Sequence, residues 1–189
     1  MPYAEVATFI SDLSAKQAVA ALALEFTILT AARTSEVTGM TWDEVDLAKA
    51  VWTIPAKRMK AGNEHRIPLS NRAVEILEAV SKLGQSWVFS GNKGKLSSMA
   101  MAMLLRRMGK DVTVHGFRSA FRDWAAECTG YPHEVCEMAL AHTIENKAEA
   151  AYRRGDLFEK RRKLMDDWTS FCSGAAIAGA TITPIRNIG

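Results

Sequence analysis

Residues 16–39, KQAVAALALEFTILTAARTSEVTG, carry the clearest structural pattern in the chain. Over Lys16–Ala32 apolar residues recur every three or four positions, which predicts a helix with one apolar face. That face consists of Val19, Leu22, Ala23, Phe26 and either Leu29 or Thr30. A short helical turn over Thr34–Gly39 follows and is stopped by its glycine. Arg33 stands between the two helices, where a charge beside an apolar element needs a partner.

Outside this stretch, further helices alternate with short β segments. Val51–Ile54 and Arg66–Leu69 are β-like, and Gly62-Asn63 in the polar loop between them predicts a hairpin turn. Trp87–Phe89 is predicted as a third short strand. Further helices are predicted after the N-cap Ser70, from Ser97 to Met108, from His115 to Cys128, after Pro132, from Glu145 to Tyr152 and from Asp156 to Phe171. The predicted fold class is mainly α with a small antiparallel β-sheet (α+β).

Composition bounds the kind of protein this is. With 189 residues, of which 48% are hydrophobic and 24% charged, the chain suits one globular domain. We expect residues 1–172 to form that domain and residues 173–189 to be a flexible tail. No charge-free apolar stretch of helical membrane-spanning length occurs, and the N-terminus lacks the pattern of a secretory signal. The cysteines, Cys128, Cys136 and Cys172, are predicted to be reduced thiols of a cytoplasmic protein.

The charge is unevenly distributed. The net charge of +3 combines −4 over residues 1–50, which hold three Lys/Arg and seven Asp/Glu, with +7 over the remainder, which holds 21 and 14. The excess of positive charge after residue 50 is compatible with a polyanionic partner.

Several polar residues are candidates for binding an anion. In the helix from His115, Phe117 is predicted to face the core together with Phe121, Trp124, Ala125 and Cys128. His115 and Arg118, three positions apart, are then expected to point together outward, where they could bind a phosphate group. A surface helix with an incidental histidine and arginine is the alternative.

Other candidates have similar alternatives. Arg33 could be oriented by Glu36 for function, or the two could form only a structural ion pair. The basic hairpin residues Lys57, Arg58, Lys60 and Arg66 could contact phosphates or form a solvated loop. His142 and Tyr152 gain interest only beside these other groups.

Two other chemistries find no support. Cys128, His133, Cys136 and His142 do not have the spacing of a zinc site, so no metal is expected. Gly91–Lys95 lacks the full spacing of a phosphate-binding P-loop.

Taken in order along the chain, these residues resemble the catalytic domain of the tyrosine recombinases, the phage integrase family. The resemblance spans about residues 4 to 168 and rests on five segments: Ala32–Val37, Met59–Ala61 with Arg66–Ser70, His115–Arg118, Ala139–His142 and Ala151–Arg154. The sequence of residues 96–109 is most similar to that of prophage and genomic-island integrases. One departure is Ala141, where the family commonly has glycine, and alanine is expected to fit there.

The resemblance implies roles for the matched residues. Tyr152 would attack the scissile phosphate and form a 3′-phosphotyrosyl bond. Arg33 and Arg118 would stabilise the charge of the transition state, and Glu36 would orient the first arginine. Lys60 would protonate the departing 5′ oxygen, His115 would accept the proton of the tyrosine, and His142 would hydrogen-bond the phosphate. Further DNA contacts are predicted at Lys57, Arg58, Lys93, Lys95, Arg106 and Arg107.

The resemblance also implies partners. They are a double-stranded DNA attachment site, other integrase protomers (a tetramer on DNA for a full-length protein, a monomer for an isolated domain) and DNA-bending accessory proteins, with no membrane and no cofactor. No clamp domain fits before residue 4, so a catalytic domain alone is expected, bacterial or phage-encoded and nucleoid-associated. The alternatives are a non-catalytic DNA-binding protein on the same fold and a type IB topoisomerase-like strand-passing enzyme.

Overall fold

The computed structural model describes residues 1–16, 18–91, 94–142 and 155–174. In chain order, its α-helices are α1 (Val6–Ser14), α2 (Val19–Thr30), α3 (Thr34–Thr38), α4 (Asn71–Ser81), α5 (Ala100–Arg107), α6 (Gly116–Cys128), α7 (His133–Ala139) and α9 (Phe158–Cys172). The strands are β1 (Val45–Asp46), β2 (Val51–Ile54), β3 (His65–Pro68), β4 (Ser90–Gly91) and β5 (Gly94–Lys95), and short 3₁₀ turns cover Tyr3–Glu5, Trp42–Glu44 and Ala56–Arg58. The predicted fold class, mainly α with a small antiparallel sheet, is confirmed.

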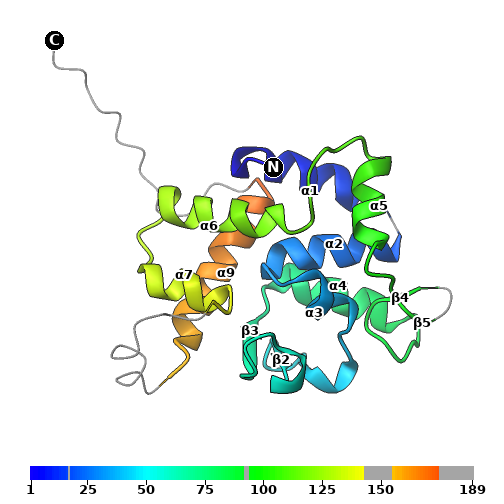
Figure 1. The fold of residues 1–189 in the computed structure, drawn as a ribbon, viewed down its shortest axis with the longest axis horizontal. Helices are drawn as coiled ribbons and strands as arrows, with labels where there is room; N and C mark the ends of the chain where they lie inside the picture. The colour runs from blue at the N-terminus through cyan, green and yellow to red at the C-terminus, as the bar shows by residue number, and fades with distance from the viewer. Residues whose placement is uncertain (17, 92–93, 143–154, 175–189) are drawn as a thin grey trace, which may run out of the picture.

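Helix α2 is the centre of the molecule. It crosses the middle of the view in Figure 1, with α6, α7 and α9 on one side and α5 with the β4–β5 hairpin on the other. Ala21 and every residue from Ala23 to Thr30 are buried, including Glu25. The prediction of a helix here is confirmed, but the prediction of a single apolar face is wrong. Because other helices cover α2 on every side, even its polar positions are buried, and Leu22 is only half-buried.

The sheet places the basic hairpin beside α3. Strands β1, β2 and β3 pair antiparallel in that order, with Val51 opposite Pro68 and Ile54 opposite His65. The turn between β2 and β3 contains Gly62 at φ +70, a left-handed conformation that glycine adopts without strain. The hairpin prediction is therefore confirmed, with β3 beginning one residue earlier than expected.

The predicted strand at Trp87–Phe89 is wrong. Val88 and Phe89 are buried side chains, and Trp87 makes only an isolated bridge to Thr41. The chain pairs just afterwards, where β4 and β5 form a two-stranded hairpin. Burial rather than sheet pairing accounts for the apolar run, because a short apolar segment can pack into a core without a neighbouring strand.

Helix α9 packs against its own chain. Its Trp168 lies in an aromatic cluster with Phe121, Trp124 and Phe171, and the Trp168 Nε1–H donates to the carbonyl of Ile28 at the end of α2 at 2.9 Å. The expected apolar face of α6 is present, except that Cys128 is exposed. This exception follows from its position as the last residue of the helix. None of the helices in the described ranges combines the length and apolar composition that a membrane crossing requires.

Candidate active site

Arg33 is held by the residue predicted to orient it. It lies in extended conformation just before α3, so its backbone N–H and its side chain both face the first turn of that helix. Glu36 accepts from the backbone N–H of Arg33 through Oε2 and from Nη1 through Oε1, each at 2.8 Å. Glu36 is buried, with 4% of its surface exposed, so its two bonds to the backbone and to the guanidinium restrict the side chain of Arg33. The remaining Nη2 lies 3.4 Å from the carbonyl oxygen of Ala141.

Arg118 is buried rather than pointing outward, which corrects the expectation from its helical spacing. Only 5% of its surface is exposed, although His115 three positions earlier is exposed. Its Nη1 donates to the carbonyl of Ala31 and its Nη2 to that of Leu140, the latter at 2.7 Å. These carbonyls end helices α2 and α7, and helix C-termini carry unpaired carbonyls and partial negative charge. The fold therefore stabilises a buried cation with the ends of two helices.

The two arginines lie close enough to repel each other. Burial first, and then the positive charge of Arg33, lower the pKa of Arg118 from its usual 12.5 to about 10. The Nε–H of Arg118 is buried and has no hydrogen-bond partner. Two adjacent guanidinium groups with unused donor capacity form a site for an anion, because a bound anion would relieve both costs.

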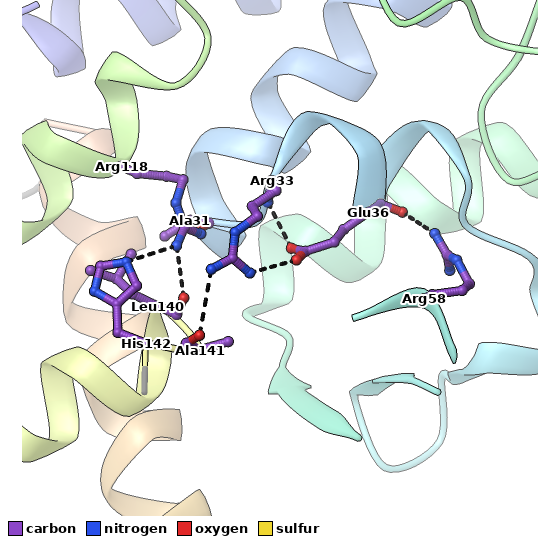
Figure 2. Close-up of polar contacts among 8 residues, drawn as sticks. All are labelled: Ala31, Arg33, Glu36, Arg58, Arg118, Leu140, Ala141 and His142. Atoms are coloured by element: carbon purple, nitrogen blue, oxygen red, sulfur yellow. Dashed lines mark hydrogen bonds and ion pairs between the residues drawn. The ribbon is translucent and has the colours of Figure 1, made fainter. Parts of the chain in front are cut away.

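His142 completes this cluster. Its Nε2 lies 3.4 Å from Nη2 of Arg118 (Figure 2). Its Nδ1 lies 2.8 Å from Oε2 of Glu137. Figure 2 shows Arg33 and Arg118 arriving from separate elements on either side of the carbonyls of Leu140 and Ala141. Residues that are far apart in the sequence, Arg33, Arg118 and His142, are thus brought together.

Ala141 has a left-handed backbone, with φ +50, and Ala31 has the same conformation with φ +49. Alanine does fit at position 141, as expected, but in a region of backbone space that favours glycine. Ala31 directly follows α2, Ala141 lies two residues after the end of α7, and both turn their carbonyl oxygens toward an arginine.

The other predicted residues lie around this cluster. His115 lies at the start of α6 and lines a 370 Å³ pocket together with Thr34, Arg106 and Lys110. Lys57 and Lys60 are exposed on the hairpin. Arg58 contacts Glu44 and donates to the carbonyl of Glu36 at 2.5 Å, so it ties the hairpin to α3.

The remaining predicted DNA contacts are peripheral or undescribed. Lys95 is exposed and lies 5.9 Å from the centre of the Trp87 ring. Arg106 and Arg107 are exposed at the end of α5. Lys93 and Tyr152 lie outside the described residues, as does the predicted helix from Glu145.

Three residues of this region were not found from the sequence. Glu137 binds His142 from five positions away, across a helix end, so helical periodicity does not reveal it. His65 is largely buried beside the cluster, where burial, followed by the charge of Arg161, lowers its pKa to about 4. Arg161 is buried in α9, and no local sequence pattern distinguishes it from the exposed basic residues around it.

Within the described ranges, no group of three or more His, Cys, Asp or Glu side chains is arranged to hold a metal ion. The concentrated groups are cations and a histidine, which suit a phosphate group held by charge-assisted hydrogen bonds.

Comparison with known proteins gives a consistent result. Residues 3–156 match the Phage integrase family. The prophage integrase IntA of Escherichia coli (strain K12) is 33% identical over 168 residues, covering 85% of this chain and 40% of IntA. The chain thus spans about two fifths of the length of that relative.

Solved structures share the fold. The integrase from mycobacterium phage Brujita superposes with a TM-score of 0.63 at 19% identity, covering 85% of this chain and 56% of that chain. A lambda integrase dimer bound to a COC′ core site superposes with a TM-score of 0.60 at 15% identity, covering 77% of this chain and 58% of that chain.

Proposed function

Because the chain belongs to the phage integrase family, we propose that it is the catalytic domain of a tyrosine-type site-specific DNA recombinase of prophage type. The observation that carries this proposal is the convergence of Arg33, Arg118 and His142 around the carbonyls that end α2 and α7. A pure DNA-binding surface does not need buried, mutually repelling arginines, whereas a site that stabilises a phosphoryl transition state does.

The chemistry follows from where these groups lie. The scissile phosphate of DNA binds between Arg33 and Arg118, whose fixed guanidinium groups compensate the charge that grows on its non-bridging oxygens. Arg33, whose side chain is 26% exposed, can donate to the phosphate beyond its bonds to Glu36 and Ala141, and Arg118 adds its buried positive charge. His142 hydrogen-bonds the same phosphate through Nε2.

Tyr152 is the proposed nucleophile. Its oxygen attacks the phosphorus, the bond to the 5′ oxygen breaks, and a 3′-phosphotyrosyl bond conserves the energy for rejoining. His115 accepts the phenolic proton, and Lys60 gives a proton to the departing 5′ oxygen. The positive charge that a metal ion supplies in other phosphoryl-transfer sites comes from the arginines and Lys60, so no cofactor is required.

The proposed partners follow from the same assignment. They are a double-stranded DNA attachment site, further integrase protomers and DNA-bending accessory proteins. The lambda integrase with this fold was solved as a dimer on a core site, which supports DNA as the substrate. The proposed location is the bacterial cytoplasm, in association with the nucleoid.

A covalent-adduct assay tests the proposal. A DNA suicide substrate carrying a relative's attachment site should become covalently linked to the wild-type chain, and Tyr152→Phe should abolish the adduct while DNA binding persists. Arg118→Ala should reduce the cleavage rate by about 10²–10³-fold, the usual loss when one preorganised charge donor is removed.

Tyr3→Phe is the matched control, since the Tyr3 hydroxyl donates to Glu127 at the surface, away from the arginine cluster, and it should leave the adduct unchanged. Adduct formation should also persist in excess chelator. An adduct that survives Tyr152→Phe, or that requires Mg²⁺, would refute this mechanism.

A further inference from the structure

Glu137 in α7 lies between a histidine and an arginine. Its Oε2 is 2.8 Å from Nδ1 of His142, and its Oε1 accepts from Nε of Arg122 at 2.8 Å. The carboxylate is only 14% exposed, whereas Arg122 on α6 is 53% exposed. Burial raises the pKa of Glu137, but the hydrogen bonds from His142 and Arg122 outweigh it and lower the pKa overall, so the group is ionised at neutral pH.

These contacts define which nitrogen of His142 carries the proton. A carboxylate only accepts hydrogen bonds and a guanidinium only donates them. Nδ1 faces Glu137 and must therefore carry a proton, while Nε2 faces Nη2 of Arg118 at 3.4 Å and must present its lone pair. These two contacts favour the Nδ1–H tautomer of the ring, with Nε2 turned into the arginine cluster.

We propose that Glu137 is a positioning residue for His142, fixing the ring with Nδ1 protonated and providing the negative charge that lets Nε2 take a second proton when a DNA phosphate binds. This inference rests on the proposed function, in which Nε2 donates to a phosphate oxygen. A lone pair at Nε2 cannot donate, so the ring must take up one proton from solvent as the phosphate arrives. The carboxylate of Glu137 then faces an imidazolium, a charge-assisted contact.

Arg122 has a supporting role in this arrangement. Its bond to Oε1 leaves Oε2 for His142 and ties α6, which carries Arg118, to α7, which carries Glu137 and precedes the loop that holds His142. If Glu137 formed only a salt bridge between these helices, its loss would affect stability and leave the ring of His142 unchanged. The state of the ring therefore distinguishes a positioning role from a structural one.

The first test measures the ring without DNA. In ¹⁵N-histidine-labelled protein at pH 8, the nitrogen chemical shifts of His142 should show the Nδ1–H form in the wild type. Glu137→Ala should move the population toward Nε2–H, because the acceptor at Nδ1 is lost. Glu137→Gln should keep the Nδ1–H form, since its amide oxygen still accepts. Glu78→Ala, an exposed carboxylate of α4, should have no effect. A wild-type ring in the Nε2–H form, or a ring unchanged in Glu137→Ala, would overturn the proposal.

The second test measures the consequence for cleavage. With saturating suicide substrate, Glu137→Ala should slow phosphotyrosyl formation by about 10- to 100-fold, by analogy with the loss when the carboxylate behind a metal-binding histidine is removed. Glu137→Gln should fall between Glu137→Ala and the wild type, because it keeps the orientation and loses the charge. DNA affinity should change little, since Glu137 does not face the phosphate.

The outcomes separate the two proposals. If the wild-type chain forms no adduct, the proposed function fails, while the ring measurement without DNA still decides whether Glu137 sets the proton of His142. If the wild type forms the adduct and Glu137→Ala does so at the same rate, the positioning role is overturned. Should Glu137→Ala not fold, the comparison of Glu137→Gln with the wild type decides, because a full cleavage rate in that folded variant would show that the charge is not used.

Discussion

Ala31 and Ala141 have the same function at two helix ends. Each adopts the left-handed conformation within two residues of a helix end, and each directs its carbonyl to an arginine of the cluster. Glycine is the usual residue for this conformation because it has no Cβ to clash with the backbone. The site is therefore built on two backbone positions where alanine carries some strain.

Ala141→Gly should relieve that strain. We expect the free energy of unfolding to rise by up to about 1 kcal/mol, because the left-handed conformation costs an alanine about 1–2 kcal/mol and glycine loses part of this gain to its larger unfolded-state entropy. Ala139→Gly is the control two residues earlier, at the last residue of α7, where the backbone is still helical, and should be destabilising by up to about 1 kcal/mol. Urea unfolding measures both. A destabilised Ala141→Gly variant would show that the alanine methyl group makes a contact that outweighs the strain.

His65 gives the domain a pH dependence. Its pKa is about 4 in the folded protein, because burial and the charges of Arg161 and Arg33 disfavour the imidazolium despite the nearby carboxylate of Glu36. The unfolded chain protonates this histidine near 6.5, so between pH 6.5 and 4 the unfolded state binds more protons and stability is lost as the pH falls. The shift corresponds to about 3 kcal/mol over that window.

The measurement is urea unfolding at pH 7 and at pH 4.5. The wild type should lose more stability between these values than His65→Asn, which lacks the titrating ring. His133→Asn, an exposed histidine on α7, should keep the wild-type pH dependence. Equal losses in the wild type and in His65→Asn would contradict the assignment.

Among the elements, the start of α9 is anchored to the sheet by one buried arginine, Arg161. Arg161 is 1% exposed, and its guanidinium donates to the carbonyl of Arg66 in β3 at 2.6 Å and to the carbonyl and carboxylate of Asp156 at 2.7 and 2.9 Å. These bonds join the start of α9 to the edge of the sheet. In the described structure this helix packs on its own chain.

Arg161→Met should destabilise the domain by about 3 kcal/mol, because an apolar side chain of similar length leaves the carbonyl of Arg66 and the carboxylate of Asp156 without their buried partner. Arg162→Ala is the neighbouring control. That arginine makes long contacts, 3.4–3.5 Å to the carbonyls of Lys49 and Ala50 and 3.5 Å to the exposed carboxylate of Glu159, and it lies 4.9 Å from the centre of the Phe158 ring. Its loss should cost less than about 1 kcal/mol. Thermal unfolding compares the two, and similar losses would mean that the buried bonds of Arg161 do not anchor the helix.

The elements also show how far sequence patterns reach. The hairpin over β2 and β3 and the helices α4 and α6 were predictable, because each has one buried face, suitable caps or a turn of glycine and asparagine. The full burial of α2 and the absence of a strand at Trp87–Phe89 were not predictable, because both depend on which distant elements cover these segments. The burial of Arg118 has the same cause, since its partners are the carbonyls of Ala31 and Leu140, which lie far away in the sequence.

At the scale of the whole molecule, the arginine cluster is expected to bind an anion and thereby to stabilise the folded domain. Arg118 is buried, repelled by Arg33 and has an unpaired Nε–H, so the folded domain carries an unfavourable charge at its centre. A ligand that binds only the folded state stabilises it by an amount set by its concentration relative to Kd. Inorganic phosphate or sulfate, which imitates one DNA phosphate, should therefore stabilise the entire domain.

The expected gain is about 2.7 kcal/mol at 100 times Kd, and for a domain of this size each kcal/mol raises Tm by roughly 2–4 °C. These anions also stabilise proteins generally through exclusion from the surface, so the variant comparison is decisive. Arg118→Gln should lose the increment above the general effect, while Arg107→Gln, an exposed arginine on α5, should retain it. Tm is measured against phosphate concentration at constant ionic strength. The same rise in Tm for the wild type and Arg118→Gln would mean that the cluster does not hold an anion, and the phosphoryl-transfer assignment would lose the observation on which it rests.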